Sequence, residues 1–319
     1  VKLAGVPRQE LREAGAVRTV AVSGHDFPDV RPDFRIEPGD RVRAGQTLFV
    51  DRRRPGIAFT APVAGIVAAI ERGRRRSLDE LVIRLDGDEA EDFSPLPEGA
   101  VAEDIRALLL RSGLWPSFLT RPFGRIPDPD AVPDAIFVTA IDTSPLAPDP
   151  RVAIGLRGRA FRRGLELLPA LTPGPVFLCH APGNSLHDGV GERIRPVVFS
   201  GPHPAGLAGT HIHHLAPVSD GGRGVWQIGY QDVIAIGYLA ESGRLLAERI
   251  VAIAGPAVQD PALARLPLGA SLDDALEGEL AGGPARVLSG PVLSGREAGY
   301  LGRYHNQGTM LPRGDGPAA

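Results

Sequence analysis

Three histidines close together are the first residues that could do chemistry. His211, His213 and His214 follow a glycine-rich loop over residues 201–210. If a β-strand carries the His-x-His pair, both rings lie on one face, as a zinc or two-metal hydrolase requires. A metal site needs at least a third ligand, and the remaining histidines have no ligand-like spacing: His25, His180, His187 and His305. We therefore predict no metal site, and a metallohydrolase using His211 and His213 stays the least favoured alternative.

The glycine-rich loop could also be a phosphate cradle. Residues 201–210 match neither G-x-G-x-x-G nor the P-loop pattern, and no strand-to-helix turn is expected there. Pro202 and Pro204 also remove backbone N–H donors that a cradle would use. We predict a rigid surface loop at the rim of an α/β sheet instead. The basic turn at 72–76 lacks interleaved aromatic residues, so it is interpreted as a docking surface for an acidic partner.

No nucleophile stands in a catalytic pattern. Ser185 and His187 share one loop, but no nucleophile-elbow motif surrounds them. Cys179 ends an apolar run, which predicts a buried and inert thiol. We therefore predict no catalytic residue in this chain.

Composition excludes several further classes of function. The net charge is −3 over 319 residues, which gives no basic field for nucleic acid. A single cysteine cannot hold an iron–sulfur cluster, and Lys2 is the only lysine, so no Schiff base, P-loop or carrier lysine is available beyond it. No apolar run is long enough to span a bilayer, and the start at Val1 shows no signal sequence. The start at Val1 also suggests that a few leading residues are missing.

The elements that must position these residues fall into three regions. Short strands with turn signals over 36–87 carry the pattern G-D-x-V-x-x-G-Q followed by A-P-x-x-G-x-V, which resembles a biotinyl/lipoyl-type barrel-sandwich hybrid. The hairpin at 51–56 would present the carrier lysine of that fold, and no lysine is present there. We therefore predict the scaffold without the carrier function.

Strands and helices alternate in the central region, which predicts an open, mainly parallel, Rossmann-like α/β sheet. The expected strands are 135–140, 175–179, 196–199 and 249–254, and the expected helices are 101–114, 158–171 and 230–246. From residue 262 a small β-grasp-like module is expected, with a short helix at 272–276 and strands at 286–290 and 299–304. The predicted domains are thus 1–99, 100–258 and 259–307, with a disordered tail over 308–319.

Several stretches, in this order, go beyond a likeness of fold. They are 59–62 with 70–73, 112–115 with 120–123, 136–143, 201–207, 209–213, 230–235 and 300–305. Together they resemble the A subunit of the sodium-translocating NADH:quinone reductase over about residues 1–307. The C subunit of the Rnf complex and the flavin-binding subunit of respiratory complex I share the general architecture, but both carry cysteine clusters that this chain does not have.

The resemblance implies a three-part fold: barrel-sandwich hybrid, Rossmann-like domain and soluble-ligand-binding β-grasp (SLBB) module. It also implies a peripheral, cofactor-free subunit on the cytoplasmic face of the bacterial inner membrane. The complex would oxidise NADH, reduce ubiquinone and export sodium, with flavins and iron–sulfur centres on partner subunits. This chain would then count as part of an enzyme without being catalytic in isolation.

In that family the corresponding subunit is linked to quinone binding or to docking near the quinone site. The expected quinone-binding residues lie near the glycine-rich loop: His203, His211, His213, Tyr230 and Gln231. Tyr230 and Gln231 could equally begin a helix that packs on the sheet. A ligand-binding or assembly module outside a working pump is the alternative function. Family members continue past residue 307 and begin with a short leading strand, so we expect either a trimmed chain or a shortened paralogue.

Overall fold

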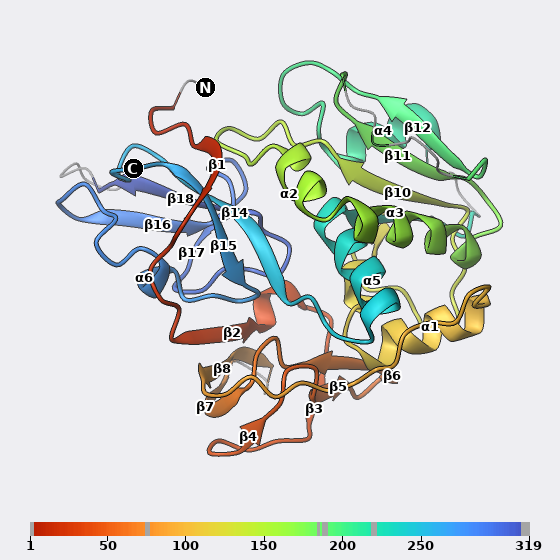
Figure 1. Cartoon of the computed structure of the whole chain (residues 1–319), viewed down its shortest axis with the longest axis horizontal. Helices are drawn as coiled ribbons and strands as arrows, with labels where there is room; N and C mark the ends of the chain where they lie inside the picture. Colours follow the sequence, from red (N-terminus) through yellow and green to blue (C-terminus); the bar gives the residue numbers. More distant parts are fainter. Residues whose placement is uncertain (1–2, 74–76, 184–185, 187–190, 218–221, 314–319) are drawn as a thin grey trace.

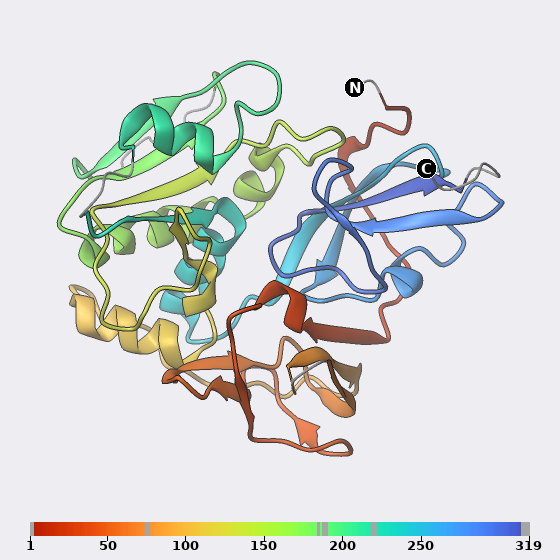
Figure 2. The ribbon, with the colours of Figure 1, turned by 180° about the vertical axis from the view of Figure 1, so that it is seen from behind.

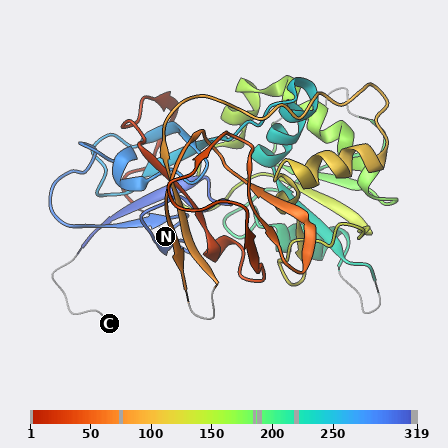
Figure 3. The ribbon, with the colours of Figure 1, turned by 90° about the horizontal axis from the view of Figure 1, so that it is seen from below.

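Three bodies meet at one junction in the computed structural model, which describes residues 3–73, 77–183, 186, 191–217 and 222–313. They are a pair of small sheets from the N-terminal part, a central α/β layer and a C-terminal sheet (Figure 1). Seen from below, the N-terminal strands cross under the other two bodies (Figure 3). The main hydrophobic core is continuous from the N-terminal sheets into the α/β layer.

The N-terminal body consists of two antiparallel sheets, the arrangement expected of a barrel-sandwich hybrid. One has the order β2-β8-β7-β4 and the other β3-β5-β6. Their bounds are β2 (Thr19–Ser23), β3 (Pro32–Phe34), β4 (Arg41–Val42), β5 (Thr47–Asp51), β6 (Arg54–Thr60), β7 (Gly65–Arg72) and β8 (Leu78–Leu85), with a 3-10 turn at Gly24–Asp26. The predicted hairpin is confirmed: β5 pairs with β6, and exposed Arg52 and Arg53 occupy its tip.

The central body is an α/β sheet with the order β12-β11-β10-β13-β9. The first four of these strands are parallel and the edge strand β9 is antiparallel, as the alternation of strands and helices predicts. The strands are β9 (Leu119–Arg121), β10 (Ala135–Ala140), β11 (Val176–His180), β12 (Ile194–Val198) and β13 (Val225–Gly229).

Helices cover both faces of this sheet. The helices α2 (Pro150–Leu156), α3 (Gly158–Leu167) and α5 (Tyr230–Ser242) lie on one face, and α4 (Ala208–Leu215) lies on the other (Figures 1 and 2). Helix α1 (Ala102–Arg111) and the 3-10 turn Trp115–Ser117 pack beside β6, and a second 3-10 turn, Leu168–Leu171, follows α3. In the described part of the chain, no helix combines the length and apolar character that a bilayer-spanning segment requires.

The C-terminal body is a six-stranded sheet with the order β1-β15-β14-β18-β16-β17. It consists of β1 (Arg8–Arg12), β14 (Glu248–Ala254), β15 (Ala262–Pro267), β16 (Ala285–Ser289), β17 (Arg296–Glu297) and β18 (Gln307–Pro312), with the short helix α6 (Leu272–Ala275). The strand expected at 249–254 exists, but its expected place in the α/β sheet is wrong. An apolar central strand has the same sequence pattern in either sheet, so only its partners β15 and β18 decide where it belongs.

Three further expectations about the ends of the chain are corrected. Strand β1 pairs with β15, so residues 8–12 belong to the C-terminal sheet and not with the N-terminal strands. Residues 308–312 are not a disordered tail, because β18 pairs with both β14 and β16. The glycine and proline in β18 are unfavourable for a strand, so the sequence pattern does not predict it. Its backbone hydrogen bonds are made with strands that are distant in the sequence. The strand expected at 299–304 is reduced to a single bridge between Ser271 and Tyr300. Residues 314–319 lie outside the described residues.

A buried carboxylate of the C-terminal body accepts hydrogen bonds from residues at the start of β2, the first strand of the N-terminal sheets. Asp274 in α6 accepts the backbone N–H of Arg18 at 2.9 Å and of Thr19 at 3.2 Å, and also the Arg18 Nε at 2.8 Å. Burial raises the pKa of Asp274, but these hydrogen bonds outweigh burial and hold its pKa below the usual range. The ionised form is therefore the one that stabilises the junction.

We predict a pH-dependent loss of stability in Asp274→Asn. Because the folded pKa lies below the unfolded value of about 3.9, the contribution is complete above about pH 5 and fades as the pH falls further. The variant should be less stable by about 1–2 kcal/mol at pH 7, and the difference from the unchanged chain should shrink from about pH 5 to about pH 2. Denaturant unfolding at a series of pH values measures it, and a constant difference would contradict the proposed role.

Candidate functional site

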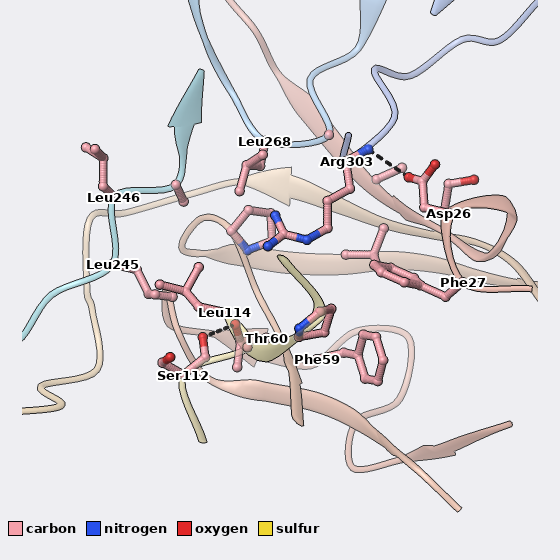
Figure 4. Close-up of a pocket in the computed structure, with 18 residues that line it drawn as sticks. Asp26, Phe27, Phe59, Thr60, Ser112, Leu114, Leu245, Leu246, Leu268 and Arg303 are labelled. Carbon is pink, nitrogen blue, oxygen red and sulfur yellow. Dashed lines mark hydrogen bonds between the residues drawn. The ribbon is translucent and has the colours of Figure 1, made fainter. Parts of the chain in front are cut away.

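A largely apolar pocket of about 70 Å³ lies where the three bodies meet (Figure 4). Phe27 and Phe59 from the N-terminal body line one side, and Leu114 lines the floor. Leu245 and Leu246, in the connection between α5 and β14, line another side and are half-buried. A water molecule needs roughly 10–15 Å³ on this scale, so the pocket has room for more than a single solvent molecule.

Arg303 is the cationic group of this pocket. Its side chain reaches among the apolar residues (Figure 4), and its backbone N–H donates to Asp26 at 2.8 Å. Its Nη2 donates to the Ser117 hydroxyl at 2.8 Å and lies 3.4 Å from Asp232. The next residue, Tyr304, donates its hydroxyl to the carbonyl of Pro116 at 2.8 Å. The segment around Arg303 is thus tied to both other bodies.

Asp232 is the buried anchor of the charge network behind the pocket. It lies in the first turn of α5 and is 5% exposed. Its Oδ1 accepts Arg249 Nη2 at 2.6 Å and the Ser117 hydroxyl at 3.0 Å, besides the longer contact with Arg303. Arg249, from β14, is 4% exposed. Two guanidiniums therefore share one carboxylate in the interior.

A second cavity, of about 240 Å³, opens on the other side of this network. It lies at the carboxyl ends of β10 and β13, with Asp142 and Ser144 on one side and Gly229 at the start of α5 on the other. The chain runs from β10 out to β11 and β12, then returns to place β13 on the opposite side of β10. Open α/β sheets form their ligand crevices at such a reversal of strand order.

The five residues predicted to bind quinone do not lie in one cavity. Tyr230 and Gln231 line the cavity at the carboxyl ends, but both are nearly buried. The Gln231 amide donates to the carbonyl of Ile250 and accepts its N–H, each at 2.8 Å, so it holds β14 against α5. Both residues begin a helix packed on the sheet, which is the alternative that the sequence left open. Burial raises the pKa of the Tyr230 hydroxyl.

The three histidines of the set do not converge on that cavity. His211 is buried, its Nε2 is 2.9 Å from the carbonyl of Ala205, and its ring lies against Phe199. Burial lowers the pKa of His211. His213 is exposed, and His203 is half-buried with its Nδ1 3.5 Å from the Thr143 hydroxyl. His211 and His203 thus help shape the glycine-rich loop.

The expectation that a strand carries the His-x-His pair is wrong. Residues 211 and 213 belong to α4, and two positions along a helix point to different sides. Within the described ranges, no three or more histidine, cysteine, aspartate or glutamate side chains are grouped closely enough to hold a metal ion. The expectation that no helix follows the loop is also wrong, because α4 begins at Ala208. Ser185 and His187 lie outside the described residues.

The single thiol is placed as the sequence predicts. Cys179 lies in β11 and is fully buried, and burial raises its pKa to about 12. A thiol with such a pKa is almost entirely protonated at neutral pH, so it is a poor nucleophile.

The charge network was missed at the sequence level. Asp232 follows the Tyr-Gln pair directly, and Arg303 stands in the 300–305 stretch, but no periodicity relates them. Arg249 follows Asp232 by 17 residues along the chain, and Arg303 follows it by 71. A sequence signal exists only in the residue types, since a buried helix start that carries an aspartate needs a cationic partner somewhere.

Comparison with known proteins supports the three-part description. Family profiles match over residues 1–86 (NqrA N-terminal barrel-sandwich hybrid domain), 100–245 (NqrA second alpha/beta domain) and 250–299 (NQRA C-terminal domain, of the SLBB type). The predicted fold class is thereby confirmed. A solved NAD+-reducing NiFe hydrogenase matches 56% of this chain and 40% of its own, with a TM-score of 0.40 and 14% identity, which is too slight to bear on fold or function.

Relatives of known family cover almost the whole chain. The A subunit of the Na+-translocating NADH-quinone reductase from Pseudomonas aeruginosa is 49% identical over 321 residues, which span 98% of this chain and 72% of that protein. The proteins of the same name from Saccharophagus degradans and a Marinomonas species are each 47% identical, over 98% of this chain and 71% of theirs. The chain therefore belongs to the NqrA family, the A subunits of the Na+-translocating NADH-quinone reductase.

Proposed function

We propose that this chain is a peripheral, non-redox subunit on the cytoplasmic face of the bacterial inner membrane. The complex it serves would oxidise NADH, reduce ubiquinone and export sodium, while partner subunits carry the flavins and iron–sulfur centres. Family membership supports the assignment to the complex. The single cysteine is buried with a raised pKa, so this chain offers no accessible thiolate for a cluster or a redox step.

We also propose that the pocket in Figure 4 receives the quinone ring. At about 70 Å³ it is smaller than the roughly 150 Å³ cavity that holds a benzene ring, so the half-buried Leu245 and Leu246 would move aside to admit the ring. The observation that carries this proposal is an apolar pocket containing one guanidinium at the junction of three bodies. A quinone ring is flat and apolar, and its two carbonyl oxygens only accept hydrogen bonds. Arginine only donates, so Arg303 is the complementary group. The hydroxyl of Thr60 is already committed, because it donates to the carbonyl of Ser112 at 2.9 Å.

The isoprenoid tail would leave the pocket along Leu245 and Leu246. These half-buried leucines lie on the connection between α5 and β14 and offer apolar surface beside the ring site. The site predicted from the sequence remains the set near the glycine-rich loop, namely His203, His211, His213, Tyr230 and Gln231. The pocket is the better-supported site, because the described lining of the cavity that Tyr230 and Gln231 share does not include the three histidines, and the Gln231 amide is already used by Ile250.

Leu245→Trp tests the ring site by filling it. We expect the affinity of the purified chain for a short-chain ubiquinone, measured by titration calorimetry, to fall by at least about tenfold. Leu293→Trp is the matched control, because Leu293 is 51% exposed and does not line the pocket. Unchanged affinity in a folded Leu245→Trp chain would exclude this pocket. The proposal gives the glycine-rich loop no contact with the ring, so a His203→Ala chain should bind normally.

A docking role is the second candidate, and one exposed aromatic residue favours it. Phe123 is 77% exposed at the turn after β9, and the Arg125 guanidinium lies 5.7 Å from its ring centre. Exposed aromatic and arginine side chains are the groups that most often anchor protein interfaces. We propose this turn as a contact with a partner subunit.

A further inference from the structure

The cavity at the carboxyl ends of β10 and β13 contains a cation that has no carboxylate partner among the described residues. Arg121, the last residue of β9, lines this cavity and donates its Nε to the Gln227 side chain at 2.8 Å. Among the described residues it forms no ion pair, and burial lowers its pKa. A half-buried guanidinium bonded only to a neutral amide is incompletely compensated.

The second cation of the cavity is also under-compensated. Arg249 lines the same space and is 4% exposed, and its Nε has no hydrogen-bond partner among the residues that the structure describes. It shares Asp232 with Arg303, so two guanidiniums divide one carboxylate. The Asp142 carboxylate is partly engaged, since it accepts the N–H of Ser144 at 2.8 Å. Arg121 and the Nε of Arg249 thus offer donors that an anionic ligand in the cavity would accept.

The start of α5 already faces a carboxylate, because Asp232 lies in its first turn. This helix is 13 residues long, and Gly229 at its N-cap provides no side-chain cap. The first N–H groups of a helix lack intrahelical partners, and the helix dipole favours negative charge there. A Cβ at Gly229 would lie 3.7 Å from Oδ2 of Asp232, so this carboxylate already occupies the helix start. The observations that point to an anionic ligand are therefore Arg121 and the Nε of Arg249.

We propose that this cavity binds the phosphate group of a phosphate monoester, with Arg121 and Arg249 beside it. A doubly charged phosphate suits two guanidiniums better than a single carboxylate does. Leu119, Ile141 and Leu207 supply apolar surface for an organic part. This site is separate from the proposed quinone pocket, and the proposal does not require that quinone binds there.

Titration of the full chain with AMP and with inorganic phosphate tests the proposal. We expect one AMP per chain by calorimetry, with a shifted phosphorus-31 resonance. In Arg121→Gln the affinity should fall by about tenfold or more, because a charge-assisted hydrogen bond is lost. Arg125→Gln is the matched control, since Arg125 lies on the following turn and pairs with the exposed Asp29. Arg121→Lys, which keeps the charge, should restore part of the affinity.

The outcomes separate the sources of the phosphate. Tighter binding of AMP than of inorganic phosphate would support an organic phosphate ligand, and equal binding would support free phosphate in the same site. No heat and no shift with either probe at about 10 mM would overturn the proposal. Binding that Arg121→Gln leaves unchanged would overturn it too. Whether either probe binds at all is measured with the unsubstituted chain. The proposal is therefore tested even if a variant fails to fold.

Discussion

Asp232→Asn should lower the free energy of unfolding by about 3 kcal/mol, because removing one member of a buried ion pair leaves its partner charged and unpaired. Asp232 and Arg249 are 5% and 4% exposed, and 2.6 Å separates their paired atoms. Arg303 loses the same partner. Asparagine preserves the size of the side chain, so the loss reports the charge and not a cavity. Guanidinium unfolding followed by circular dichroism measures the change.

Asp33→Ala is the control for this prediction. Asp33 pairs with Arg35 at 3.0 Å, but both side chains are well exposed. Exposed pairs contribute about 0–1 kcal/mol, so this variant should unfold almost like the unchanged chain. If Asp232→Asn lost no more than Asp33→Ala, the three bodies would not be joined through the Asp232 network.

Gly237→Ala should destabilise the chain by about 2–3 kcal/mol although alanine is the better helix former. A methyl group at Gly237 would lie 1.8 Å from the carbonyl oxygen of Ala160 and 2.6 Å from the backbone nitrogen of Gly164. The reciprocal position is equally tight, since a Cβ at Gly164 would lie 2.1 Å from the carbonyl oxygen of Val233. Helices α3 and α5 would have to separate to admit the methyl group. Thermal unfolding measures the effect.

Gly209→Ala provides the matched change in a helix with free space. A Cβ at Gly209, in α4, would meet no atom within 4 Å. This substitution should stabilise the chain by up to about 0.5–1 kcal/mol through propensity alone. Opposite signs for the two alanine variants would confirm the tight crossing of α3 and α5, and equal effects would contradict it.

Local patterns predict the elements better than their partners. The apolar runs at 135–140 and 175–179 are strands, and the helix expected from residue 230 begins there, although it ends at Ser242, where Gly243 adopts a left-handed conformation. The sheet membership of β14 could not be predicted, because period and apolarity are properties of a strand alone while pairing depends on distant segments. Strand β1 shows the same limit, since mostly exposed polar residues form it and only pairing with β15 makes it a strand.

The candidate site was less accessible to sequence than the fold. Histidines attract attention because they titrate and bind metals, but His211 is a buried structural residue under the glycine-rich loop. Arg303, Asp232 and Arg121 come from three separate segments that only the tertiary fold brings together. Arginine is also common throughout this chain, so no single arginine stands out before its burial is known.

The junction of the three bodies gives the proposed functions a common physical basis. The Asp232 network separates the apolar pocket, which contains Arg303, from the charged cavity, which contains Arg249. A ligand in either space contacts an arginine that shares the same carboxylate. We therefore expect the two sites to influence each other through Asp232, to the extent that a ligand draws its arginine away.

Photo-crosslinking of the assembled complex with a ubiquinone analogue tests the central claim most directly. We expect labelled peptides of this chain that contain Leu114, Leu245 or Leu246, with labelling suppressed by excess ubiquinone and reduced in the Leu245→Trp complex. Labelling confined to other subunits, in a complex that contains this chain and reduces quinone, would contradict it.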